Sequence, residues 1–208
     1  SCLFKTSKMF FWLSLLSALA LNAEEMVTHS YFMEQTLCIP VGQPLEKTVK
    51  YVVQMAGAAK GGKFRFLILN CHGFYDKRQG AWQASGGFGL QLGAGIHRSN
   101  VYQLAPLRGL VENIWIHACG TARQTNVGAR GERDGGDGLM LCSEIARTTG
   151  AYVVAATMTQ YASAQLPKYH IDDFDGVVLQ FGPQGNVVWQ HDYGRSLLRA
   201  LTHFINPN

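Results

Sequence analysis

Charge is scarce in this sequence, and its cysteines are not arranged in pairs. Only 15% of the 208 residues are charged, and the lysines and arginines behind the formal net charge of +4 are scattered along the chain. Nothing in this pattern predicts a nucleic-acid partner. The five cysteines form no Cys-x-x-Cys pair, which excludes zinc-ribbon and thioredoxin-like sites. An odd number of cysteines in a chain of this length does not indicate a disulfide framework either.

Several sequence motifs that define large enzyme classes are also missing. The chain has no Gly-x-Ser-x-Gly segment, which excludes the nucleophile elbow of serine hydrolases. It has no phosphate-binding Gly-x-x-x-x-Gly-Lys-Ser/Thr loop and no Gly-x-Gly-x-x-Gly segment after an apolar strand, so we expect no nucleotide cofactor. No repeat of fixed period is present.

The N-terminus has the three-part pattern of a secretory signal peptide. Lys5 and Lys8 precede an uncharged run from Met9 to Leu21, and Ala18-Leu19-Ala20 is a small-x-small cleavage site. We therefore expect residues 1–23 to be a signal peptide or an N-terminal extension. The run is too short for a comfortable membrane span, which needs about 20 apolar residues. The protein is then secreted or periplasmic, with no stable membrane span after signal removal.

An alternative is that the start of the chain is an upstream extension, with translation beginning at Met9 or Met26, which leaves the protein cytoplasmic. In either case residues 26–208 are long enough, and at 47% apolar residues in the whole chain apolar enough, for one globular α/β domain.

The rest of the chain alternates apolar strand patterns with helical patterns, which favours a mostly parallel sheet covered by helices. We expect an edge strand within His29–Ile39 and a hairpin after residue 175, followed by a terminal amphipathic helix over Ser196–Ile205. The expected core elements are helices at Gln43–Ala59 and Gly138–Thr149 and buried strands at Phe64–Asn70, Asn113–Ala118 and Ala151–Thr157.

Two chemically matched motifs follow the first two of these buried strands. His72-Gly73 comes directly after one strand, and Ala118-Cys119-Gly120 ends the next, 47 residues later. Carboxyl ends of parallel strands meet at one edge of a sheet, where ligands of such folds bind. A cysteine nucleophile needs an imidazole to raise its thiolate fraction and N–H donors for the oxyanion that forms. The pattern predicts a His72/Cys119 pair, with the N–H groups of Gly73 and Cys119 as the oxyanion donors.

These motifs resemble those of the caspase-like (clan CD) cysteine peptidases, and most of all the bacterial CHAT domains. The similarity lies in Asn70-Cys71-His72-Gly73-Phe74-Tyr75-Asp76, in Ile116-His117-Ala118-Cys119-Gly120-Thr121-Ala122, and in the helix and strand that follow. It implies a caspase-like three-layer α/β sandwich with a mostly parallel central sheet. It also implies an endopeptidase that cleaves protein or peptide substrates through an acyl-enzyme, with His72 as base or imidazolium partner, Cys119 as nucleophile and no cofactor.

The chain departs from this family at two positions. Basic-specific relatives often carry an acid two residues before the cysteine, where this chain has His117, so a substrate preference does not transfer. Thr121 stands where the caspase signature has glycine. Neither the oligomeric state nor the residue preferred at the cut follows from the sequence.

Alternatives remain open at several positions. The domain could be a binding or scaffold module that has lost turnover, or His72, His117 and Cys119 could be three ligands of a zinc ion. Asp76 either orients His72 or caps a turn. Cys71 and Cys142 are expected in the core. Two sets of charged loop residues are expected to be solvated. The alternative for the first set is a loop that is processed by proteolysis: Arg123, Arg130 and Arg133. The alternative for the second set is a place near the cleft or the binding of a cation: Asp172, Asp173 and Asp175.

Overall fold

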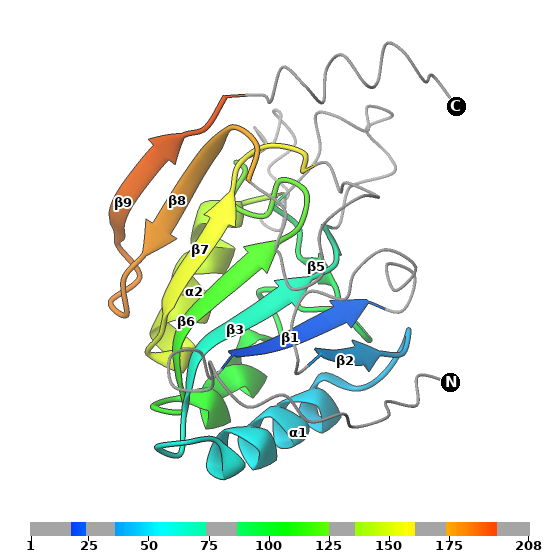
Figure 1. Ribbon diagram of the computed structural model, residues 1–208. Coiled ribbons are helices and arrows are strands. Elements are labelled where there is room, and N and C mark those ends of the chain that lie inside the picture. Colours follow the sequence, from blue (N-terminus) through cyan, green and yellow to red (C-terminus); the bar gives the residue numbers. More distant parts are fainter. Residues whose placement is uncertain (1–17, 24–35, 74–86, 125–135, 161–173, 195–208) are drawn as a thin grey trace, which may run out of the picture.

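The fold is an α/β arrangement around one seven-stranded sheet (Figure 1). The computed structural model describes residues 18–23, 36–73, 87–124, 136–160 and 174–194. The sheet order is β2-β1-β3-β6-β7-β8-β9, parallel from β2 through β7, with β8 and β9 antiparallel. The strands are β1 (Ala18–Ala23), β2 (Thr36–Ile39), β3 (Phe64–Asn70), β6 (Val111–His117), β7 (Tyr152–Ala156), β8 (Val177–Phe181) and β9 (Val187–Asp192). The α/β class and the mostly parallel first part of the sheet are confirmed.

The first helix, α1 (Leu45–Ala58), forms as its apolar spacing predicts. Pro44 is its N-cap residue, a place where the missing N–H of proline costs no helical hydrogen bond. Leu45, Val49 and Val52 recur on one face of the helix and are all buried. Thus α1 covers the sheet with its apolar face.

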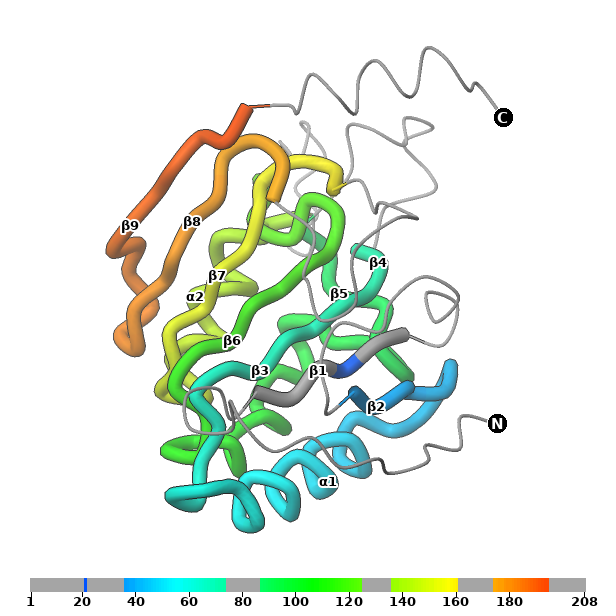
Figure 2. Tube along the Cα trace, viewed as in Figure 1, coloured from blue at the N-terminus to red at the C-terminus, as the bar shows by residue number. Residues whose placement is uncertain are grey.

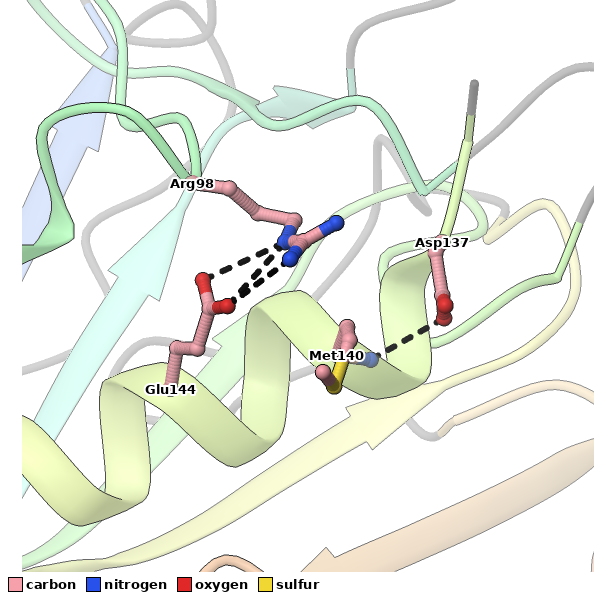
Figure 3. Close-up of polar contacts among 4 residues, drawn as sticks. All are labelled: Arg98, Asp137, Met140 and Glu144. Atoms are coloured by element: carbon pink, nitrogen blue, oxygen red, sulfur yellow. Dashed lines mark hydrogen bonds and ion pairs between the residues drawn. The ribbon is translucent and has the colours of Figure 1, made fainter. Parts of the chain in front are cut away.

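The second helix, α2 (Gly138–Thr149), has the bounds predicted from the sequence. The Asp137 side chain accepts a hydrogen bond from the Met140 N–H at 3.0 Å, which caps the first turn (Figure 3). Gly150, in the left-handed conformation at φ 69°, ends the helix. Arg98 reaches from a loop to Glu144, 2.9 Å away, and ties that loop to the outer side of the helix.

All described helices lie on one face of the sheet, as the ribbon and the tube both show (Figures 1 and 2). A 3₁₀ helix, η3 (Val101–Leu107), packs with α1 and α2 over Leu67, Ile114 and Val153 in one continuous core. Residues that alternate with these, such as Trp115 and Val154, belong to a second, smaller apolar cluster on the opposite face. Among the described residues, no helix covers that second face.

The opposite face of the sheet carries an aromatic cavity of about 580 Å³. The rings of Phe66 and Trp115 meet edge to face there, 5.4 Å apart, and Trp189 of β9 lines the same cavity. The sequence predicts strands buried on both faces. Arg65 on β3 is instead exposed, and Trp115 is only half-buried. The difference arises because the described helices cover only one face of the sheet.

Strand β1 lies within the segment that the sequence predicts to be a signal peptide. Ala18–Ala23 pairs in parallel with both β2 and β3, and Leu21 is 2% exposed. The backbone of this segment therefore belongs to the sheet, and the Leu21 side chain belongs to the core. Within the described residues, no helix combines the length and the apolar character needed to cross a membrane.

The remaining elements follow the predicted order with shifted bounds. The hairpin is formed by β8 and β9, and the predicted edge strand is present as the shorter β2. Two short strands, β4 (His72–Gly73) and β5 (Leu90–Gln91), form a separate antiparallel pair. The predicted terminal helix over Ser196–Ile205 falls outside the described residues.

Candidate functional site

Strands β3 and β6 end at the same level of the sheet. They pair in parallel, and Asn70 at the end of β3 lies opposite His117 at the end of β6. The chain leaves both strands at the carboxyl edge, where β4 and β5 follow β3 (Figure 2). The two motifs singled out in the sequence thus begin side by side.

The histidine motif turns outward directly after β3. Cys71 is 2% exposed, and its N–H donates to the main-chain oxygen of His117 at 3.3 Å. His72, the next residue, is exposed and pairs with Gln91 of β5. Cys71 is therefore a core residue, as predicted, and the His72 side chain is open to solvent at the sheet edge.

The two motifs touch through their backbones at Gly73 and Cys119. A Cβ atom on Gly73 would lie 2.1 Å from the main-chain oxygen of Cys119, closer than non-bonded atoms can approach. Only glycine allows this contact. The residue after His72 is thereby held directly against the cysteine.

Cys119 lies in a tight turn that is fixed to the extension of β7. Gly120 has a φ of 57°, a conformation that glycine adopts readily, and its N–H donates to the Met158 oxygen at 2.7 Å. Thr121 is fully buried, and its hydroxyl donates to the Ala118 oxygen at 3.2 Å. The hydroxyl thereby satisfies the carbonyl at the start of the turn.

The thiol of Cys119 is half-buried and lies among polar groups. Its sulfur donates to the main-chain oxygen of Gln160 at 3.5 Å. Burial has the largest effect and raises the pKa of the thiol; the contact with the Gln160 main chain and the positive charge of Arg123 lower it, and the negative charge of Asp175, the smallest effect, raises it. The net direction is upward, so the protonated thiol is the resting form at neutral pH.

His72 and Cys119 share the carboxyl edge, but their side chains are not joined in this state. Among the contacts of the described residues, none links the His72 ring to the Cys119 sulfur. Catalytic hydrogen bonds are often long without substrate and tighten in the complex, so the pairing of His72 with Cys119 stays a prediction.

Three residues near the thiol were missed or misjudged from the sequence. Gln160 drew no attention, although it lies four residues after β7. Asp175 and Arg123 were expected in solvent, but Asp175 is 3% exposed and the Arg123 Nε donates to the Thr157 oxygen at 2.8 Å. All three lie just beyond a strand of the sheet or just before one, at the edge that also carries Cys119. Their position next to predicted strand ends was the one feature of the sequence that could have identified them.

The proposed metal site is not supported. His117 is 5% exposed, and its ring lies 5.6 Å from the ring of Phe174, between centroids. Within the part of the chain that the structure describes, no group of three His, Cys, Asp or Glu side chains is placed to hold a metal ion. That part includes His72, His117 and Cys119. Asp76, expected either to orient His72 or to cap a turn, lies outside it.

No protein-family model matches the chain, and no curated protein matches it either. The functional argument therefore depends on the residues at the carboxyl edge of the sheet.

Proposed function

We propose that the protein is a cysteine endopeptidase, with His72 and Cys119 as its catalytic residues on a caspase-like three-layer sandwich. The observation that carries the proposal is the contact of Gly73 with the Cys119 carbonyl. It supports a site at which the ends of β3 and β6 act together. The parallel order of β2, β1, β3, β6 and β7 supports the same reading, because ligands of such sheets bind at the carboxyl edge.

The chemistry needs only groups of this chain and water. His72 accepts the thiol proton, and the Cys119 sulfur attacks the scissile carbonyl carbon, placing negative charge on its oxygen. The N–H groups of Gly73 and Cys119 are the proposed donors to that oxygen. The C–N bond then breaks, the amine leaves with the proton from His72, and water releases the acid from the thioester. No cofactor is required.

The resting state of the thiol sets a condition on this mechanism. The pKa of Cys119 is raised by burial, so proton transfer to His72 has to accompany substrate binding rather than precede it. His72 is exposed and sits on the short β4, which leaves its ring free to approach the sulfur when a peptide fills the edge. We propose a protein or peptide substrate and assign no preferred residue at the cut.

One observation favours a second function, a caspase-like binding or scaffold domain without turnover. The pKa of the Cys119 thiol is raised, whereas activated nucleophilic cysteines usually have a lowered pKa. In that case the carboxyl edge would hold a peptide without cutting it.

A cleavage assay separates the two functions. Wild type, Cys119→Ala, His72→Ala and Cys38→Ala are incubated with a mixed peptide library, and the cut bonds are counted by mass spectrometry. We expect Cys119→Ala to abolish cleavage and His72→Ala to slow it by about 100-fold or more. A variant lacking both should be no worse than Cys119→Ala, since the two residues act as a unit.

Cys38→Ala is the matched control, because Cys38 lies on β2, at the far end of the sheet order, and is partly buried like Cys119. It should cleave as the wild type does. Wild-type rates in Cys119→Ala would reject the peptidase. If wild-type protein binds library peptides and cuts none of them, the binding domain takes its place.

A further inference from the structure

The side chain of Gln160 is fully engaged with main-chain groups at the candidate site. Its Oε1 accepts from the Asp175 N–H at 2.9 Å, and its Nε2 donates to the Asp175 oxygen and to the Met158 oxygen, both at 3.0 Å. The residue is 7% exposed. A buried amide needs hydrogen-bond partners, and all three that Gln160 has are main-chain groups of Met158 and Asp175.

These bonds join two segments from different parts of the chain, and a third is attached to the first of them. Met158 follows β7, Asp175 precedes β8, and the turn after β6 is attached to the same place because the Gly120 N–H donates to the Met158 oxygen at 2.7 Å. Gln160 therefore connects the segment that follows β7, to which the cysteine turn is bonded, with the segment that precedes β8.

The main chain of Gln160 also contacts the nucleophile itself. Its carbonyl oxygen accepts from the Cys119 sulfur at 3.5 Å, so the position of that oxygen fixes the direction of the thiol. The amide of the same residue fixes the oxygen by holding residue 160 to Met158 and Asp175. The side chain of Gln160 thus fixes its own main-chain oxygen, and that oxygen in turn fixes the direction of the Cys119 thiol.

We propose that Gln160 is the positioning residue of Cys119: its amide bonds to Met158 and Asp175 hold its carbonyl oxygen where it aims the thiol. The effect on peptide cleavage rests on the proposed function, whereas the effect on the thiol does not. A misdirected sulfur slows the chemical step, while the peptide-binding surface stays in place. Loss of the amide should therefore lower kcat and leave KM nearly unchanged.

The test uses two Gln160 variants and one matched control. Gln160→Met keeps the length of the side chain and removes all three hydrogen bonds. Gln160→Leu removes the same three hydrogen bonds with a different side-chain shape and places no charge beside the thiol, so it serves if the first variant folds poorly. Gln43→Met is the control, because Gln43 donates one side-chain bond to Thr48 at 2.8 Å at the start of α1.

The readouts are site-resolved alkylation of Cys119 by iodoacetamide as a function of pH, peptide-cleavage kinetics and thermal melting. In the Gln160 variants we expect the midpoint of the alkylation profile to move by about half a pH unit or more. We also expect kcat to fall by about 10- to 100-fold, with KM within about twofold of wild type. Gln43→Met should lower the melting temperature without moving the midpoint or kcat.

The outcomes separate this inference from the peptidase proposal. If folded Gln160 variants keep the wild-type alkylation profile, the inference is wrong, whether or not any peptide is cut. If the profile moves and wild-type protein cuts no peptide, Gln160 still positions the thiol and the peptidase proposal fails alone. A changed profile with unchanged kcat in a cleaving enzyme would also overturn the inference.

Discussion

The thiol of Cys119 lies under the influence of two opposite charges. Arg123 lowers its pKa and Asp175 raises it, while burial is the largest effect and raises it. The hydrogen bond from Arg123 to the Thr157 oxygen keeps the guanidinium charge beside the cysteine turn. The reactivity of the cysteine is thus set by groups that lie outside the His/Cys motif.

Replacing Arg123 by glutamine should make the thiol less acidic. The positive charge favours the thiolate, so its loss raises the pKa of Cys119 and moves the alkylation midpoint upward by about half a pH unit. The rate of Cys119 alkylation at neutral pH then falls about threefold, because it is proportional to the thiolate fraction. Arg98→Gln, which breaks the exposed pair with Glu144, is the control. An unmoved or lowered midpoint in Arg123→Gln would contradict the electrostatic role of Arg123.

Cys71 should make the fold sensitive to alkali. Burial raises the pKa of its thiol from 9.0 to about 12, so above pH 9 the unfolded chain loses a proton that the folded chain retains. Stability is therefore complete below pH 9 and falls as pH rises toward 12, by up to about 1.4 kcal/mol per pH unit. Urea unfolding at pH 8 and pH 10.5 measures this slope.

The comparison variant for this slope is Cys71→Ala. It is less stable at pH 8 because a buried sulfur is lost, but its stability should depend less steeply on alkaline pH. Equal slopes in both proteins would mean that Cys71 does not stay protonated in the fold.

At the scale of elements, the sequence predicts helices and strands correctly where the apolar pattern fits only one kind of secondary structure. Gly138–Thr149 and Phe64–Asn70 were predicted with the bounds that the structure has, because caps and apolar runs mark both ends. Ala18–Ala23 was not predicted as a strand, since a short apolar run before small residues is equally typical of a signal peptide. The two-residue strands β4 and β5 carry no pattern of their own.

The candidate site was predictable to the same extent. His72 and Cys119 follow strands directly, so the pairing of β3 with β6 brings their backbones together. Gln160 and Asp175 act through side-chain-to-backbone bonds between loops, which depend on how β7 and β8 are aligned. That alignment is a tertiary property, and no local pattern in the sequence encodes it.

The contact between β4 and the cysteine turn yields a prediction about glycine. Gly73→Ala places a Cβ 2.1 Å from the Cys119 oxygen, so one of the two segments has to move. We expect peptide cleavage and Cys119 alkylation to change together, with activity reduced about 100-fold for a displacement of about 1 Å. Kinetics and thermal melts of the purified variant measure both.

Gly57→Ala is the matched control for this substitution. Gly57 lies in α1 with open space around its Cβ position, so alanine should stabilise the helix by about 0.5–1 kcal/mol and leave activity unchanged. Normal activity in Gly73→Ala would show that the carboxyl edge tolerates separation of the two motifs.

At the scale of the whole molecule, the N-terminal segment has two competing roles. A signal peptide would be removed near Leu21 on secretion, whereas β1 occupies the sheet between β2 and β3. Secretion stays a prediction, and N-terminal sequencing of protein from its native host tests it. A mature chain that begins after Ala20 would retain only part of β1.

Leu21→Ala measures how much the sheet depends on β1. Leu21 is 2% exposed, so in the full chain its truncation should lower the free energy of unfolding by about 2–5 kcal/mol. Val188→Ala on β9, where Val188 is 48% exposed, should cost much less. Urea unfolding of both variants makes the comparison. Equal, small losses would argue that β1 contributes little to the folded protein.

The parallel pairing of β3 with β6 has a consequence for how the protein acquires its site. Parallel strands cannot join through a tight turn, so each pairing closes a long stretch of chain, and such nonlocal topologies fold slowly. Until the sheet is complete, Cys71, Cys119 and Cys142 lack the surroundings that keep them protonated. During refolding they are ordinary reactive thiols, open to oxidation and to wrong disulfides. Preparations refolded with a reductant present until the end should therefore recover more protein with intact Cys119 than those refolded in air.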